Sequence, residues 1–220
     1  MSANIAIFAS GAGSNARRII EYFTPPPPAP LHPIIAGEKG KSHIRPESLL
    51  KKEIKISLIV SNKPGAGVLK IAEEFNIPSI ILDKEKFFRG NAYVDELKNA
   101  NIGLIVLAGF LWKVPSALIN AFPGKILNIH PALLPKYGGK GMYGNFVHEA
   151  VIAAGDKKSG ITIHVVDELY DHGKHIFQAI CPVLPGDTPE TLAKRIHELE
   201  HNNFPRVIEE YIRNVVLKQG

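Results

Sequence analysis

An amide and an imidazole stand two residues apart in the segment Asn128-Ile-His-Pro131. The apolar run before them predicts a buried strand over residues 125–129, so both polar side chains would lie where this strand ends. An amide donor beside a histidine that titrates near neutral pH suits a reaction in which an oxyanion develops and a proton moves. Asn128 and His130 are therefore predicted to be catalytic; the alternative is that they are ordinary turn residues.

A carboxylate that could orient His130 occurs later, in the segment Val166-Asp-Glu-Leu-Tyr-Asp-His-Gly173. A negative charge beside an imidazole favours its protonated form. We therefore predict that Asp171 completes the catalytic group. The isolated histidines His148 and His164 are interpreted as structural residues.

A glycine-rich turn, Gly11-Ala-Gly-Ser-Asn-Ala16, follows the first predicted strand and fits the dinucleotide-binding pattern. A dinucleotide-binding fold also needs an acidic residue at the end of its second strand, and here that strand ends Ile59-Val-Ser-Asn-Lys63. What remains is a tight turn before a helix, whose free N–H groups and dipole favour a phosphate. Ser14 and Asn15 can add side-chain hydrogen bonds. The alternative is a plain strand-to-helix turn.

The segment His197-Glu-Leu-Glu-His201 matches the His-Glu-x-x-His pattern of zinc peptidases. Such a site also needs a third ligand, and the only carboxylates that follow, Glu209 and Glu210, lie further along the same predicted helix. We therefore predict no metal. The segment is either a polar helix face or a helix from which Glu200 alone reaches the cleft.

The composition is that of one ordinary globular domain, with 220 residues, 45% of them hydrophobic and 21% charged. The net charge of +5 suits a phosphorylated or polycarboxylate ligand. Because no dense basic cluster with interleaved aromatic residues occurs, nucleic acid is not the expected partner. No apolar run is long enough to cross a bilayer. With a single cysteine, Cys181, and no secretory signal, we expect a cytoplasmic protein.

Strands and helices are predicted to alternate, which indicates a single Rossmann-like α/β domain with a doubly wound, mostly parallel sheet. The predicted strands are 4–9, 54–60, 78–82, 102–108, 125–129, 159–166 and 175–183, the last two pairing antiparallel. The predicted helices are 16–22, 67–75, 91–99, 115–121, 143–154 and a long C-terminal one, 188–216, capped by Asp187 or Thr188 and kinked at Pro205.

Four consecutive prolines mark residues 24–47 as a surface insertion, and a helical turn is predicted over residues 48–52. In a doubly wound sheet, ligands bind at the carboxyl ends of the strands. We therefore expect residues 10–15, 108–114 and 128–137, which follow three strands, to line one cleft.

The chain resembles the folate-dependent phosphoribosylglycinamide formyltransferase family. The segments that carry the resemblance occur in order along nearly the whole chain: Ser10–Asn15, Val60–Lys63, Leu107–Phe110, Asn128–Lys136, Gly160–His164, Asp167–Asp171 with Gln178, and Gly186-Asp187 through Glu200-His201.

This resemblance implies direct transfer of the formyl group of 10-formyltetrahydrofolate, a co-substrate, to the amine of 5-phosphoribosyl glycinamide, without a metal. Asn128 would bind the formyl oxygen, His130 would donate a proton, and Asp171 would pair with His130 and raise its pKa. The implied contacts to the ribotide are Gly13, Ser14, Asn15, His197 and Glu200. The implied contacts to the folate are Arg89, Leu111, Trp112, Lys113, Val114, Asn128, Asp167, Glu168, Leu169, Tyr170 and Asp171.

The chain departs from the family at the 24–47 insertion, at the loop 137–144, which is longer and lacks a histidine, and at the folate-contacting arginine, for which Arg89 is the nearest match. Two alternatives share parts of this pattern. A formyltetrahydrofolate deformylase has the same catalytic residues behind a regulatory domain, and a phosphate-binding module would need only the glycine turn. The expected partners are small molecules, with no nucleic acid or membrane, and the expected state is a monomer or homodimer.

Overall fold

The computed structural model describes residues 3–24 and 54–216. From residue 25 onward, the predicted proline-rich insertion lies outside these ranges, as does the helical turn predicted over residues 48–52.

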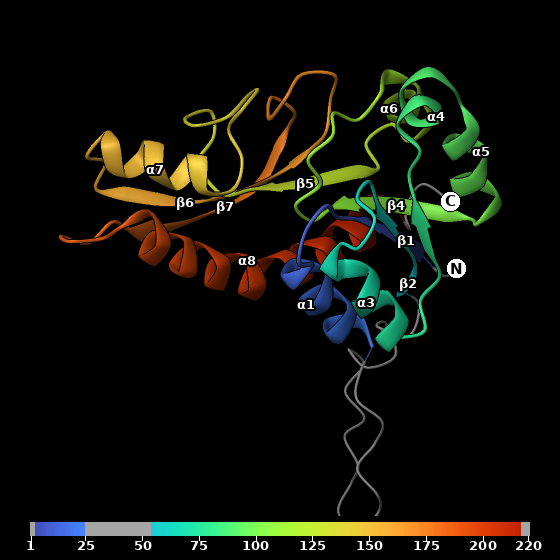
Figure 1. Cartoon of the computed structure of the whole chain (residues 1–220), viewed down its shortest axis with the longest axis horizontal. Helices are drawn as coiled ribbons and strands as arrows, with labels where there is room; N and C mark the ends of the chain where they lie inside the picture. The colour runs from blue at the N-terminus through green and yellow to red at the C-terminus, as the bar shows by residue number, and fades with distance from the viewer. Residues whose placement is uncertain (1–2, 25–53, 217–220) are drawn as a thin grey trace, which may run out of the picture.

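Within the described ranges the strands form one seven-stranded sheet in the order β3-β2-β1-β4-β5-β6-β7 (Figure 1). Neighbours from β3 to β5 run parallel, whereas β6 is antiparallel to both β5 and β7. The prediction of a mostly parallel sheet with an antiparallel pair near the C-terminus is confirmed. The strands are β1 (Ala3–Phe8), β2 (Ile54–Ser61), β3 (Ser79–Ile81), β4 (Ile102–Leu107), β5 (Ile126–His130), β6 (Lys158–Val165) and β7 (His175–Pro182).

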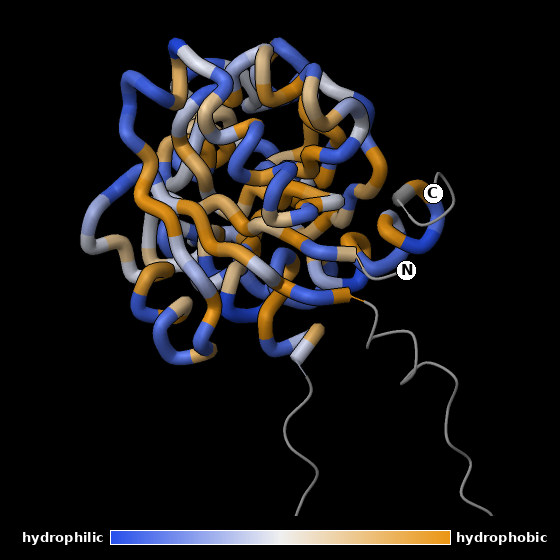
Figure 2. The backbone as a smooth tube through the Cα atoms, turned by 90° about the vertical axis from the view of Figure 1, so that its right-hand side faces the viewer, coloured by the Kyte–Doolittle hydropathy of each residue, from blue (hydrophilic) through white to orange (hydrophobic). Residues whose placement is uncertain are grey.

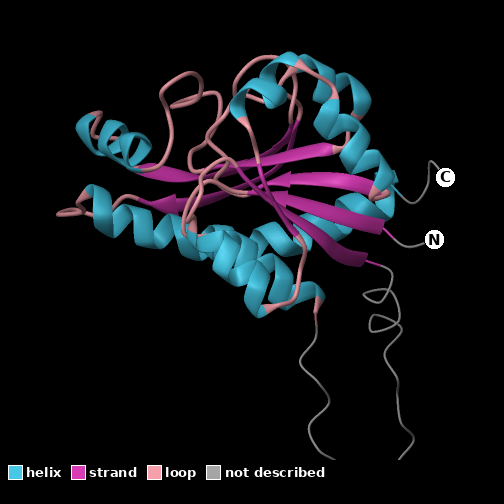
Figure 3. Ribbon diagram, turned by 45° about the vertical axis from the view of Figure 1, so that its right-hand side comes forward, coloured by secondary structure: helices cyan, strands magenta, loops and turns pink. Residues whose placement is uncertain are grey.

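Helices cover both faces of the sheet, with α1, α3 and α8 on one face and α4, α5 and α6 on the other (Figures 1 and 3). In the described part of the chain, no helix has the length and apolar character needed to cross a membrane. The helices are α1 (Ser14–Phe23), α3 (Gly67–Glu74), α4 (Lys84–Arg89), α5 (Ala92–Asn99), α6 (Ser116–Ala121), α7 (Asn145–Ala153) and α8 (Pro189–Tyr211), followed by the π-helical turn η1 (Ile212–Val216).

The strand β1 explains why the sheet is apolar on both sides. Ile5 and Ile7 pack into the core beneath α1 and α8, whereas Ala6 and Phe8 pack into the core beneath α5 and α6. A central strand covered on both faces buries every side chain and shows no alternation of polar residues. Figure 2 shows such hydrophobic stretches running through the interior, while hydrophilic residues gather in the peripheral loops.

The prediction missed one helix and named the cap of another correctly. The short helix α4 was not predicted; the Asp83 side chain caps it by accepting the Lys86 N–H at 2.9 Å. Six residues are too few to establish a helical period in the sequence. The long helix α8 is capped by Thr188, one of the two predicted caps. It runs from Pro189 to Tyr211 with Pro205 inside it.

The strand order reverses at β1: β2 and β3 lie on one side of it, and β4 and the later strands lie on the other. The loops that follow β1 and β4 diverge there and leave room for a ligand. Ser10 ties them together, because its N–H donates to the Gly109 carbonyl at 3.1 Å and its Oγ accepts the Leu111 N–H at 2.9 Å. These two hydrogen bonds hold the loops after β1 and β4 against each other.

We predict that Gly160→Ala destabilises the fold through the pairing of β6 with β7. An added Cβ would lie 2.0 Å from the Ala179 carbonyl oxygen and 2.7 Å from Leu133 Cδ2, so a strand must shift. Overpacking of this kind should lower the free energy of unfolding by about 2–3 kcal/mol, measured by urea denaturation. The matched control is Gly90→Ala, whose nearest atom would be the Lys86 carbonyl oxygen at 3.5 Å. Equal stability of the two variants would contradict the prediction.

Candidate active site

A cavity of about 840 Å³ opens at the carboxyl ends of β1, β4 and β5. Its walls include Ser10 to Asn15, Leu107 to Val114 and Asn128 to Pro131, so the structure brings together the three segments that were expected to share a cleft. The loop over residues 139–144, the segment after β6 and the helices α7 and α8 complete the walls.

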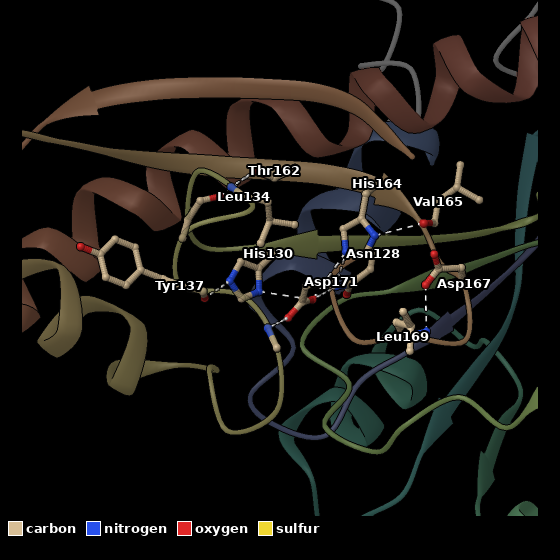
Figure 4. Close-up of polar contacts among 12 residues, drawn as sticks. Asn128, His130, Leu134, Tyr137, Thr162, His164, Val165, Asp167, Leu169 and Asp171 are labelled. Atoms are coloured by element: carbon tan, nitrogen blue, oxygen red, sulfur yellow. Dashed lines mark hydrogen bonds and ion pairs between the residues drawn. The ribbon is translucent and has the colours of Figure 1, made fainter. Parts of the chain in front are cut away.

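The Asp171 carboxylate lies at the centre of a polar cluster on this cavity (Figure 4). Its Oδ1 is 3.5 Å from His130 Nδ1, 3.5 Å from Asn128 Nδ2 and 3.6 Å from His164 Nε2. Its Oδ2 accepts the Gly139 N–H at 2.9 Å. The predicted group of Asn128, His130 and Asp171 is thus assembled, and His164 joins it.

The strands β5 and β6 position three members of this cluster. Asn128 and His130 alternate along β5 with Leu127 and Ile129, which face the core beneath α8. Alternate residues of a strand share a face, so the amide and the imidazole point the same way. In the antiparallel pairing with β6, Asn128 is opposite His164, and Asn128 Nδ2 lies 3.1 Å from His164 Nε2.

The loop between β6 and β7 holds Asp171 in a left-handed backbone conformation, with φ of 54°. This conformation costs an L-residue roughly 1–2 kcal/mol, so neighbouring contacts must impose it. Gly173 packs so closely on β6 that a Cβ would lie 1.8 Å from the Val165 carbonyl oxygen. Asp167 fixes the start of the loop by accepting the Leu169 N–H at 2.9 Å and contacting His172 Nδ1 at 2.8 Å.

The surroundings of His130 determine which nitrogen can exchange a proton. Nε2 lies 2.7 Å from the Tyr137 carbonyl oxygen, which can only accept, so Nε2 carries a hydrogen. Nδ1 faces Asp171, and a proton taken up by the neutral ring would arrive there. Burial lowers the pKa of His130 below its ordinary value, although Asp171 and the Tyr137 carbonyl act to raise it. Asp171 therefore acts on the pKa of His130 in the expected direction, but desolvation outweighs the carboxylate and the net shift is downward.

Asp171 remains charged in the same surroundings. Burial acts to raise its pKa, but the His164 hydrogen bond, the His130 ring and the Gly139 N–H together hold the pKa below its ordinary value. The cluster therefore combines a charged carboxylate with an imidazole whose pKa lies below its ordinary value.

The glycine turn forms the opposite end of the cavity. Gly13 has φ of 81°, and a Cβ there would lie 2.9 Å from Val68, so only glycine fits before α1. Ser14 and Asn15 begin the helix and line the cavity, with Asn15 Nδ2 donating to Glu200 Oε2 at 2.8 Å. Glu200 is buried, and burial raises its pKa.

The residues of the segment His197–His201, which matches the zinc-peptidase pattern, lie in different places on helix α8. His197 and Glu200 line the cavity, whereas His201 is absent from its walls. The rings of His197 and His201 stack with centroids 6.3 Å apart. Among the described residues, no three His, Cys, Asp or Glu side chains are grouped as metal ligands.

Most of the residues predicted to contact folate lie on the cavity wall, but two of them do not. Leu111, Trp112, Lys113 and Val114 line the cavity, as do Asp167, Leu169 and Tyr170. The two segments approach each other, with Lys113 Nζ 5.9 Å from the centre of the Tyr170 ring. Glu168 and Arg89 are not on the cavity wall; the largely exposed Arg89 pairs with Glu85 at 2.8 Å.

Two histidines interpreted as structural residues line the cavity instead. His164 could have been found only from the β5–β6 register, which the sequence does not reveal. His148 lies on α7, is 2% exposed, and has no hydrogen-bond partner for Nδ1 in the described part of the chain. Burial, and then the nearby His197 and His130, lower its pKa to about 4.

Residues 36–208 match the model of the formyl transferase family, and the chain belongs to that family. Within it, the similarity is to phosphoribosylglycinamide formyltransferases, as the sequence predicted. The enzyme of that name from Bacillus subtilis is 33% identical over 211 residues, which cover 94% of this chain and 93% of the relative. The crystal structure of phosphoribosylglycinamide formyltransferase from Bacillus halodurans has a TM-score of 0.74 at 31% identity, covering 96% of each chain.

A plant relative is longer than this chain. The chloroplastic phosphoribosylglycinamide formyltransferase of Vigna unguiculata is 39% identical over 209 residues, which cover 93% of this chain but 59% of the relative. The chain thus spans about three fifths of that relative's length.

We predict that His148 makes the fold sensitive to acid. Its pKa falls from 6.5 to about 4 on folding, so below pH 6.5 the unfolded chain binds more protons and stability decreases toward pH 4. Between about pH 7.5 and about pH 5, this histidine should cost about 2 kcal/mol, at 1.36 kcal/mol per pKa unit. Urea denaturation of the wild type and His148→Phe at both pH values measures this cost as a difference. If the free energy of unfolding had the same pH dependence in the two proteins, His148 would not be the source of the acid sensitivity.

Proposed function

We propose that the protein transfers the formyl group of 10-formyltetrahydrofolate to the amine of 5-phosphoribosyl glycinamide, a step of de novo purine biosynthesis. One observation carries the proposal: a single cavity joins the glycine turn at Gly13 to the cluster of Asn128, His130 and Asp171. The glycine turn suits a phosphate, and the cluster suits transfer through an oxyanion. The names of the relatives support this choice of acceptor.

The two substrates would enter from different sides of the cluster. The ribotide phosphate would lie at the N-terminus of α1, where Gly13, Ser14 and Asn15 line the cavity. His197 and Glu200, also on the cavity wall, would contact the rest of the ribotide. The folate would lie between the segments 111–114 and 167–171. The amine and the formyl carbon would then meet beside Asn128 and His130.

The chemistry is an acyl transfer without a covalent enzyme intermediate. The amine nitrogen attacks the formyl carbon, a carbon–nitrogen bond forms, and the carbonyl oxygen becomes an oxyanion. The Asn128 amide group and the protonated His130 stabilise that oxyanion. His130 becomes protonated by taking up the proton that the amine loses, and N10 receives that proton when its bond to the formyl carbon breaks.

The lowered pKa of His130 fits this reaction. A ring that is mostly neutral before attack gains its positive charge as the oxyanion forms, with Asp171 facing Nδ1. An interaction that strengthens only in the transition state accelerates the reaction without tightening the binding of the substrate.

The proposed partners are these two small molecules, and the proposed compartment is the cytoplasm. The unpaired, buried Cys181 supports a reducing compartment. Because one relative is named chloroplastic, subcellular fractionation is the appropriate check.

The ribotide-dependence of folate turnover tests the proposed function. The protein is mixed with 10-formyltetrahydrofolate, with and without 5-phosphoribosyl glycinamide, and the deformylated folate is followed by absorbance. We expect turnover only when the ribotide is present. Turnover without the ribotide would indicate a deformylase, and no turnover with ribotide binding retained would indicate a binding module.

The matched variant for this assay is His130→Ala. Because the role of His130 lies in the transition state, kcat should fall about 100-fold or more, while the Kd for the ribotide should change less than about threefold. Isothermal titration of the ribotide gives the Kd independently of turnover. Equal losses in kcat and ribotide affinity would sink the assigned role.

A further inference from the structure

His148 is a buried polar side chain on the cavity wall for which the proposed reaction has no role. It lies on α7, whose other buried residues are Val147 and Val151, and it is 2% exposed. No hydrogen bond involves either ring nitrogen within the described residues, and Nδ1 is fully buried. Its neighbours on the sheet behave differently, since His130 and His164 both have partners.

An unpartnered polar group of this kind weakens the fold. A buried donor or acceptor without a partner loses its hydrogen bonds to water and gains none in return, whereas an apolar ring of similar shape would avoid that cost. A histidine in the cavity wall therefore makes physical sense if its partner arrives with the ligand. With a pKa of about 4, the ring is neutral at physiological pH and offers one N–H donor and one acceptor nitrogen.

The electrostatic neighbours of His148 locate it along the cavity. His197, at the end where the phosphate turn and Glu200 lie, and His130, in the catalytic cluster, both affect its titration. All of these residues line the same cavity, so with the ribotide placed as proposed, His148 would lie beside the part between its phosphate and its amine. The part of the ribotide between its phosphate and its amine is the ribose, whose hydroxyl groups both donate and accept hydrogen bonds.

We propose that His148 is a positioning residue that hydrogen-bonds to a ribose hydroxyl of the ribotide and so aligns the amine with the formyl carbon. This inference rests on the proposed function, which supplies the ribotide. Loss of the bond should weaken ribotide binding and also slow transfer, because small misplacements of a reacting group reduce the rate strongly. The folate, bound on the other side of the cluster, should be affected little.

The first test compares His148→Phe with His201→Phe. Both replace an imidazole that has an unpartnered, buried nitrogen, but His201 lies outside the cavity wall. We expect kcat/KM for the ribotide to fall about 10- to 100-fold in His148→Phe, with KM for the folate within about threefold of wild type. The thermal midpoint should stay unchanged or rise at neutral pH, and His201→Phe should retain wild-type kinetics. Unchanged ribotide kinetics in His148→Phe would overturn the inference.

A second test identifies the hydroxyl directly. A ribotide analogue that lacks the 2-hydroxyl and one that lacks the 3-hydroxyl are assayed with wild type and His148→Phe. If His148 binds one of these groups, the wild type should discriminate against the corresponding analogue, and the variant should lose most of that discrimination. Equal discrimination by the two proteins against both analogues would overturn the proposal.

A measurement on the wild type covers the case in which His148→Phe does not fold. In protein labelled with ¹⁵N-histidine, saturating ribotide should change the NMR chemical shifts of the His148 ring nitrogens, whereas folate alone should leave them unchanged. An unperturbed ring would count against the inference even without a usable variant. Failure of the proposed function would be distinct, because the wild type itself would then show no ribotide-dependent turnover.

Discussion

The arrangement of the site depends on the Asp171 carboxylate, whose side chain is only 10% exposed. Asp171 faces His130, His164 and Asn128 through one oxygen and binds the Gly139 N–H through the other. A charge removed from water must be compensated by such partners, and here they come from β5, β6 and the loop after β5. The same contacts that keep Asp171 ionised therefore fix the positions of the side chains that are proposed to be catalytic, and they order the cavity wall.

The rest of the fold positions the residues that surround Asp171 and line the cavity. The parallel strands place the loops after β1 and β4 at one edge, where Ser10 joins them. The reversal at β6 brings His164 opposite Asn128 and returns the chain so that Asp171 folds back over β5. Gly13 and Gly173 permit close approaches that any side chain would block. Helix α8 contributes Glu200 to the cavity wall, and the hydrogen bond that Glu200 accepts from Asn15 ties the helix to the glycine turn.

Local patterns predicted most of this fold but not the pairings across it. The apolar strands, the glycine turn and the polar pair at the end of β5 are readable because periodicity and residue type act over a few residues. The position of His164 beside Asn128 depends on the β5–β6 register, and the position of His148 on the cavity wall depends on the packing of α7. The sequence predicted that Asp171 acts to raise the pKa of His130, but not that burial makes the net shift downward, because a sequence does not reveal the depth of burial. Arg89 was assigned by its place in the sequence, and the structure pairs it with Glu85 instead.

The most direct test of the central claim is the titration of His130 by NMR in the wild type and in Asp171→Asn. The substitution keeps the size of the side chain and an oxygen for the Gly139 N–H, but it removes the charge that faces Nδ1. Because that charge opposes the effect of burial, the pKa of His130 should be lower in Asp171→Asn than in the wild type. An unchanged or higher pKa would contradict the account, since the carboxylate would then not stabilise the protonated ring.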